Sequence, residues 1–143
     1  MREAGEPLPL QVVKGPYGPH VQDLQHLLRG MQGRYLVEIT GDDEPLELLP
    51  EALREARAKL AATPDTNARV ERVGRLIDGF ESSFGLELLG TVDWVIRHEH
   101  ATLEQQVIDR TYEWGERKRQ FSRRQVLLAR EVLTELGWVD TAV

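Results

Sequence analysis

Cysteine is absent from the 143-residue sequence, which excludes disulfides, thiolate catalysis and cysteine-ligated zinc. The sequence also has no run of 18 apolar residues, so it predicts no transmembrane helix. Its N-terminal residues lack the apolar stretch of a signal peptide. We therefore expect a cytoplasmic protein that makes no contact with a membrane.

Motifs of the common catalytic and ligand-binding classes are also missing. His98-Glu99-His100 does not have the spacing of a zinc-binding His-Glu-x-x-His helix, and no Gly-x-Ser-x-Gly or Walker A pattern occurs. The glycine-rich segment from Gly15 to Pro19 contains two prolines, which lack the amide donors that a phosphate loop uses. The sequence therefore predicts no cofactor and no metal.

Acidic and basic residues are concentrated in different segments, although the net charge of the chain is only -6. Residues 38–51 contain acids and no base: Glu38, Asp42, Asp43, Glu44, Glu47 and Glu51. Residues 117–130 contain bases and no acid: Arg117, Lys118, Arg119, Arg123, Arg124 and Arg130. Such a chain could meet a basic partner, an acidic partner or both.

Apolar spacing and capping residues predict six helices. The first begins near Pro19 and stops at Gly30 and Gly33. The others are predicted over residues 50–62, 66–82, 86–98, 103–117 and 123–136. A β-branched and aromatic run predicts a strand over residues 34–40, and residues 10–13 could form another.

The fold class that follows is mainly α. We expect a linker or remnant over residues 1–14 and a compact six-helix domain over residues 15–143, with at most a small β-sheet. Helix 86–98 is apolar nearly all round, which predicts a central, buried helix. Capping-box patterns from Thr102 to Gln105 and from Ser122 to Gln125 precede the last two helices. Gly137 predicts a stop after which Trp138 and Val139 fold back on the core.

The last two predicted helices have the outline of a helix-turn-helix with a minimal wing, which leaves a DNA-binding function open. In a winged-helix-like regulator that uses helix 123–136, Arg119, Arg123 and Arg124 would contact phosphates. Acids also lie close to these arginines, and the chain is acidic overall. Direct binding of nucleic acid is therefore the alternative function, and not the favoured one.

Acids at helical spacing suggest a different relation to nucleic acid. Asp78 and Glu81 lie three residues apart, and four residues of helix rise about 6 Å. That rise is of the order of the charge spacing along a stretched single strand, so an acidic helix can stand in for phosphates on a DNA-binding partner. Phe84 follows in a predicted connection, where its ring could pair with a partner.

Several short strings between about Gly15 and Val139 occur together in this sequence. They are Tyr17-Gly18-Pro19, Gly33-Arg34-Tyr35-Leu36, Gly79-Phe80-Glu81-Ser82, Phe84-Gly85-Leu86-Glu87-Leu88-Leu89, Thr91-Val92, Trp94-Val95, Glu116-Arg117-Lys118-Arg119 and Gly137-Trp138-Val139. With these strings the sequence resembles the C-terminal, toxin-binding domain of the DarG antitoxins from DarT–DarG toxin–antitoxin systems.

The resemblance implies a partner and a function. In this family the DarT toxin uses NAD to ADP-ribosylate thymidine in single-stranded DNA, an N-terminal macrodomain of the antitoxin removes the modification, and the C-terminal domain binds the toxin. The present sequence has neither the length nor the strand–helix alternation of a macrodomain, so we expect the chain itself not to be an enzyme. The full-length protein would carry the macrodomain.

The acidic helices and the resemblance together predict neutralisation by partial mimicry of single-stranded DNA. Carboxylates would replace phosphates in the toxin groove, and Phe84 would replace a stacked base. The first set of predicted contacts is Asp78, Glu81, Phe84 and Glu87. The second set is Asp42, Asp43 and Glu44.

Overall fold

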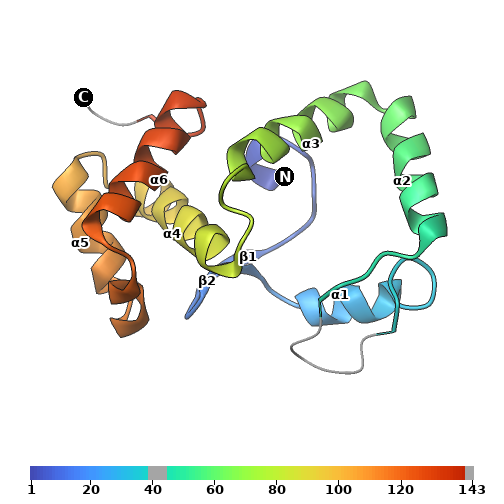
Figure 1. Ribbon diagram of the computed structural model, residues 1–143, viewed down its shortest axis with the longest axis horizontal. Helices are drawn as coiled ribbons and strands as arrows, with labels where there is room; N and C mark the ends of the chain where they lie inside the picture. The colour runs from blue at the N-terminus through green and yellow to red at the C-terminus, as the bar shows by residue number, and fades with distance from the viewer. Residues whose placement is uncertain (39–44, 141–143) are drawn as a thin grey trace. The chain divides into compact units, whose positions relative to one another are not determined.

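A computed structural model describes residues 1–38 and 45–140 (Figure 1). The chain divides into two compact units. The first consists of Met1–Gln11 and Val21–Val73, and the second of Val12–His20 and Gly74–Val143. The described residues contain six α-helices and one two-stranded sheet, which confirms the predicted mainly α class.

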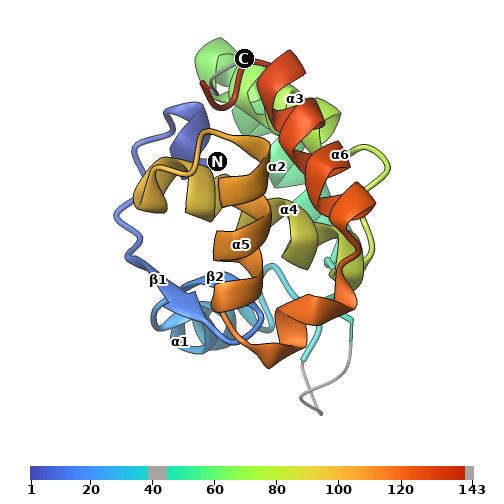
Figure 2. The same cartoon turned by 90° about the vertical axis from the view of Figure 1, so that its left-hand side faces the viewer.

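Three helices form the core of the second unit: α4 (Ser83–Glu99), α5 (Glu104–Glu113) and α6 (Arg123–Glu135). Helix α4 packs against both α5 and α6, and α5 also packs against α6 (Figure 2). As predicted, α4 is buried over most of its circumference, with Val92 and Val95 fully enclosed. The 3₁₀ helix η2 (Glu116–Gln120) lies between α5 and α6, so their connection is longer than the expected short turn.

Capping groups set the ends of these helices. Ser82 Oγ accepts a hydrogen bond from Gly85 N at 3.0 Å and caps α4. Ser122 and Gln125 form the predicted capping box of α6, with reciprocal bonds of 3.2 and 2.9 Å. After Leu136 the chain turns at Gly137, whose φ is 65°.

Two predictions near α5 and α6 have different outcomes. Trp138 and Val139 are buried, as predicted. The capping box expected from Thr102 to Gln105 is wrong, because Gln106 Oε1 accepts from both Thr102 N and Leu103 N instead. Helix α5 also ends before Trp114, and not at the expected residue 117.

The helix expected from Pro19 forms only from Leu24, and its first residues belong to a β-hairpin. Strands β1 (Val12–Gly15) and β2 (Gly18–Val21) pair across Pro16 and Tyr17. Gly18 has φ 115°, in the left-handed region that favours glycine. A Cβ on Gly15 would lie 2.4 Å from the His20 ring. The glycines therefore permit a tight hairpin, and helix α1 (Leu24–Met31) begins only afterwards.

Tertiary contacts fasten the hairpin to the helical part of the second unit. Trp114 Nε1 donates a hydrogen bond of 2.8 Å to Gly15 O. The ring of Pro19 lies beside Gly90 of α4, with Cδ 3.5 Å from the position that a Cβ on Gly90 would take. Sequence periodicity cannot detect these contacts, because the partners are about 70 to 100 residues away.

The first unit contains η1 (Arg2–Ala4), α1, α2 (Pro50–Ala62) and most of α3 (Pro64–Ile77). The bounds of α2 agree with the prediction. The prediction that the next helix reaches residue 82 is wrong, because Gly79 adopts φ 84° shortly after Ile77. Glu6 accepts hydrogen bonds from Arg69 and Thr66 of α3, so the N-terminal segment is attached to this unit.

The strand predicted over residues 34–40 does not form within its described part, residues 34–38. Leu36 instead makes isolated bridges to Gln32 and Leu48. Residues 39 and 40 lie outside the described part of the chain. Among the described residues, no helix is long and apolar enough to cross a membrane.

Close packing at the start of α4 predicts the effect of a methyl group on stability. A Cβ on Gly85 would lie 2.6–2.9 Å from the backbone of Phe80. We expect Gly85→Ala to lower the free energy of unfolding by about 1–3 kcal/mol, as overpacking does. Gly74→Ala in α3 is the matched control, because no atom lies within 4 Å of the added methyl. Its helix propensity predicts an unchanged or higher stability. Urea unfolding of both variants measures the difference, and equal effects would contradict it.

Candidate functional site

The predicted contact residues Asp78, Glu81, Phe84 and Glu87 lie at the junction of α3 and α4. Asp78 and Glu81 are exposed in the connection that follows Ile77. Phe84 and Glu87 lie in the first turns of α4. The structure therefore leaves two of the three carboxylates accessible to a partner.

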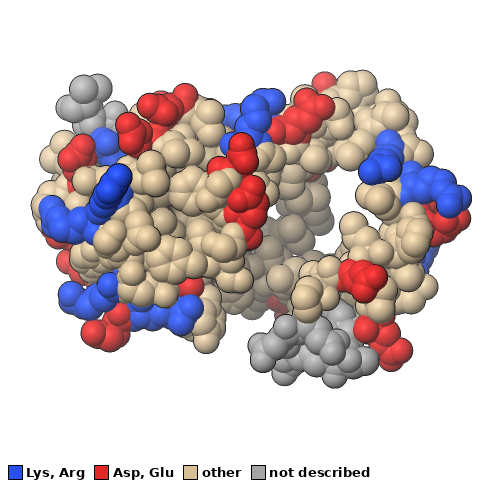
Figure 3. Space-filling view, in the orientation of Figure 1, with Lys and Arg blue, Asp and Glu red and all other residues tan. Residues whose placement is uncertain are grey.

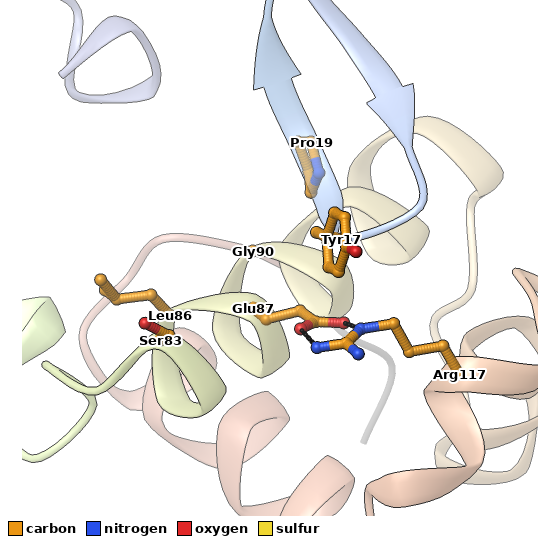
Figure 4. Close-up of a pocket in the computed structure, with 7 residues that line it drawn as sticks. All are labelled: Tyr17, Pro19, Ser83, Leu86, Glu87, Gly90 and Arg117. Carbon is orange, nitrogen blue, oxygen red and sulfur yellow. Dashed lines mark hydrogen bonds and ion pairs between the residues drawn. The ribbon is translucent and has the colours of Figure 1, made fainter. Parts of the chain in front are cut away.

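Glu87 has a different environment from the one expected for a DNA mimic, because it is buried. Its Oε1 accepts from Lys118 Nζ at 2.7 Å and from Gln120 Nε2 at 3.3 Å. Arg117 reaches both carboxylate oxygens, at 3.2 Å from Nε and 3.1 Å from Nη2 (Figure 4). The Glu87 carboxylate is thus occupied by groups of its own chain.

The ionisation of Glu87 follows from these contacts. Burial of the carboxylate acts to raise its pKa, but the hydrogen bonds and charges of Arg117 and Lys118 outweigh burial, and the pKa lies below its ordinary value. The same pairing with Glu87 raises the pKa of Arg117. Both groups therefore stay charged at neutral pH.

The ion pairs of Glu87 hold neighbouring surface residues in place, whereas the buried carboxylate itself is not part of the surface. Lys118 is fully buried, so the carboxylate holds η2 against α4. The guanidinium of Arg117 lies under the Tyr17 ring, 4.6 Å from its centroid, which is a cation–π contact. Tyr17 at the hairpin turn is 68% exposed. Glu87 therefore supports an exposed aromatic ring through Arg117.

An open pocket of about 480 Å³ lies beside this cluster (Figure 4). Seven residues line it: Tyr17, Pro19, Ser83, Leu86, Glu87, Gly90 and Arg117. Its exposed wall combines an aromatic ring and Leu86 with the guanidinium of Arg117. The sequence analysis did not predict Tyr17 or Arg117 as residues of this site. The two residues are about 100 positions apart, and only the tertiary structure brings them together.

Phe84 is only partly available to a partner. Its ring packs edge-on against the buried ring of Phe121, with 5.1 Å between centroids, and the residue is 38% exposed. Phe84 lies in the first turn of α4, and the sequence prediction that it lies in a connection is wrong. One side of the ring is thus anchored, while another part reaches the surface next to Ser83.

The three arginines of the alternative DNA-binding function are all exposed, whereas Lys118 of the same basic segment is buried. Arg119 and Arg123 are exposed, and they contact Glu116 at 3.7 Å and Gln105 at 2.9 Å. Arg124 is also exposed, at the start of α6. Arg117 and Lys118 are paired with Glu87. The basic segment therefore presents fewer free charges than its sequence indicates, which does not favour the DNA-binding function.

Two other features of the sequence analysis concern the second set of predicted contacts and metal binding. Asp42, Asp43 and Glu44 lie outside the described residues. Within residues 1–38 and 45–140, no three His, Asp or Glu side chains are grouped as metal ligands.

Comparisons with known proteins find relatives over most of the chain. A protein of Thermus aquaticus named DNA ADP-ribosyl glycohydrolase is 34% identical over 140 residues, which cover 96% of this chain and 39% of that protein. Proteins with the same name from Mycobacterium bovis and Mycobacterium tuberculosis are each 33% identical over 126 residues, covering 81% of this chain and 36% of theirs. No family model matches the chain. The chain thus spans less than two fifths of the length of these relatives.

These relatives correct one prediction from the sequence. We expected the chain not to be an enzyme, yet proteins that align with up to 96% of it carry the name of an enzyme. The name agrees with the DNA ADP-ribosylation system that the sequence resemblance implied.

The Glu87 cluster predicts how stability depends on pH. Because the pKa of Glu87 is lower in the folded protein than in the unfolded chain, its contribution is present above the ordinary value of 4.5 and is lost as the pH falls through the folded value. Glu87→Gln leaves the buried Lys118 charge uncompensated, so we expect a loss of about 3 kcal/mol at neutral pH. The loss shrinks as the pH falls through the lowered pKa of Glu87, because the wild-type carboxyl is then neutral as well.

Urea unfolding of the wild-type and variant proteins at several pH values checks this prediction. Glu113→Gln is the matched control, because Glu113 pairs with Arg110 at the surface, and we expect a change within about 0.5 kcal/mol. Adding Lys118→Met to Glu87→Gln removes the unpaired charge and restores part of the stability. A loss at Glu87 that does not vary with pH would contradict the assigned ion pairs.

Proposed function

We propose that this chain binds and neutralises a DarT-type DNA (thymidine) ADP-ribosyltransferase toxin by occupying its groove for single-stranded DNA. The observation that carries the proposal is the 34% identity over 96% of the chain with a protein named DNA ADP-ribosyl glycohydrolase. An enzyme that acts on ADP-ribosylated DNA implies that another enzyme of the same system attaches ADP-ribose to DNA. The proposal concerns what the surface of this chain binds, and a glycohydrolase activity is compatible with it.

The exposed acids at the α3–α4 junction support an electrostatic mode of binding. The toxin has to hold DNA, so its groove is expected to be basic. Asp78 and Glu81 would present carboxylates to the groups that bind phosphates, and charge-assisted hydrogen bonds would hold them. The exposed part of Phe84 would take the place of a stacked base. A toxin occupied in this way cannot admit its substrate strand.

Glu87 takes an indirect part in this mode. Its carboxylate is buried under Arg117 and Lys118, so it would position the first turns of α4 and the Tyr17 ring, without replacing a phosphate. Asp42, Asp43 and Glu44 remain a second set of proposed contacts, on the strength of their sequence pattern alone.

The setting in which the chain works is part of the same proposal. The relatives are more than twice as long as the aligned segment, and the DarG resemblance supports an N-terminal macrodomain in the full-length protein. We place the protein in the cytoplasm, where the toxin would meet replicating DNA.

A displacement experiment tests the proposal. A fluorescent thymidine-containing single strand is bound to a catalytically inactive toxin of the DarT type, and its anisotropy is followed as this chain is added. We expect the chain to release the strand from the toxin without binding the strand itself. A strand that stays bound to the toxin, or tight binding of the chain itself to single-stranded or duplex DNA, would reject toxin neutralisation by mimicry.

Charge reversal at the exposed acids tests the proposed contacts. Asp78→Arg with Glu81→Arg places two cations against a basic groove, so we expect toxin binding to weaken by more than tenfold, about 1.4 kcal/mol. Glu131→Arg with Glu135→Arg on α6 is the matched control, since it makes the same change in net charge at exposed positions elsewhere. Titration calorimetry measures both. Equal weakening by the two pairs would show a dependence on net charge and would contradict the assigned surface.

A further inference from the structure

Helix α1 is amphipathic, yet its apolar face is exposed. Leu24, Leu27 and Met31 recur at the spacing of one helical face. They are 44%, 43% and 37% exposed, and no residue of α1 is fully buried. A surface helix of this pattern normally packs its apolar side against a core. The apolar face of α1 is therefore exposed, although its sequence pattern is that of a helix packed against a core.

The residues that follow α1 add further exposed apolar side chains beside this helix. Val37 N donates to Glu47 O at 2.9 Å, and Leu49 N donates to Tyr35 O at 3.0 Å, so residues 35–37 pair with residues 47–49. Tyr35 N also donates to Met31 O at 2.8 Å, which ties this pair to the end of α1. Leu46 and Leu48 are more than half exposed.

The first unit covers little apolar surface of its own. Among its described residues, the buried apolar side chains are Leu36 and Ala52. Scattered exposed leucines are ordinary, but several that are gathered on one helix and on the strand-like pair beside it mark an interaction surface. We name Leu24, Leu27, Met31, Val37, Leu46 and Leu48 the α1 surface.

Charges near the α1 surface identify the kind of partner. Glu38 and Glu47 are exposed on or beside the paired segments. Glu51 is exposed at the start of α2, where it pairs with Arg54 at 2.9 Å, and Arg29 and Arg34 are exposed bases of the same region. Figure 3 shows acidic atoms beside the uncharged surface in the region of α1, and both acidic and basic atoms over α2. A second copy of this chain would bring like charges together, which is unfavourable. A basic protein with an apolar patch is complementary in both respects.

We propose that the α1 surface is a second docking site, which holds an apolar patch bordered by basic residues on the same toxin. This inference rests on the proposed function and adds to it an apolar anchor separate from the acids at the α3–α4 junction. Desolvated leucine and methionine side chains slow dissociation, while the neighbouring glutamates speed association with a basic protein.

The test uses the full chain and a catalytically inactive DarT-type toxin in a surface-binding experiment that resolves association from dissociation. The variant Leu24→Gln, Leu27→Gln, Met31→Gln keeps helix propensity and net charge while it removes the apolar face. We expect dissociation to become at least tenfold faster with little change in association. Glu38→Lys with Glu47→Lys should slow association severalfold at low salt and leave dissociation nearly unchanged.

Matched controls separate the α1 surface from exposed leucines in general. Leu103→Gln with Leu128→Gln alters residues of similar exposure in the second unit, on the approach to α5 and on α6. We expect these substitutions to change the dissociation rate by less than twofold. Circular dichroism and thermal unfolding of the triple variant should match those of the wild-type chain, because its substituted residues are exposed.

Each outcome decides between this inference and the proposed function. If the wild-type chain binds the toxin and the triple variant binds it equally well, the α1 surface is not a docking site while the proposed function stands. If the wild-type chain does not bind the toxin, both fail. A lower melting temperature for the triple variant, or a dimer of the wild-type chain that the variant loses in sedimentation, would overturn the assignment of the toxin, because another surface of the chain or a second copy would then cover α1.

Discussion

The pairing of the Glu87 carboxylate with the buried Lys118 ammonium is the interaction on which the site in the second unit depends. A charge in a protein interior is tolerated only when it is paired and hydrogen-bonded, and here the two groups lie 2.7 Å apart. The pair holds η2 against α4. Arg117 binds the same carboxylate and supports the Tyr17 ring. One carboxylate thus brings together a helix, a 3₁₀ turn and a hairpin from three parts of the sequence.

The fold gives charged residues two different roles, which the sequence alone does not distinguish. Glu87 faces inward and organises the site, whereas Asp78 and Glu81 face solvent and can meet a partner. The basic segment divides in the same way, since Lys118 is buried and Arg124 is exposed. Charge density along the sequence therefore overstates the charge that each surface presents, and it does so for both signs.

The two units differ in how they would contribute to binding. The second unit has a dense helical core and offers a rigid surface, so little ordering free energy is spent on binding there. The first unit joins its helices through short backbone bridges around Leu36 and leaves much of its apolar surface open. A partner that covers this surface would add apolar burial to the electrostatic attraction of the acids. In the proposed complex, the toxin would be held by two kinds of interaction with different dependence on salt.

Local signals in the sequence determined the presence of most helices and some of their ends. The bounds of α2, the Ser122–Gln125 capping box and the turn at Gly137 each depend on residues within one or two helical turns. The overall resemblance to DarG was also available from the sequence, and the relatives agree with it. The same local reasoning wrongly extended the first helix to Pro19, where pairing with β1 prevails.

Tertiary structure alone decided which carboxylates are exposed, where the hairpin is attached and which helix face remains uncovered. Glu87 meets Arg117 and Lys118 about 30 residues away, and Gly15 meets Trp114 across 99 residues. The physical reason is that backbone hydrogen bonds and caps are made by near neighbours, whereas burial depends on which distant segment covers a side chain.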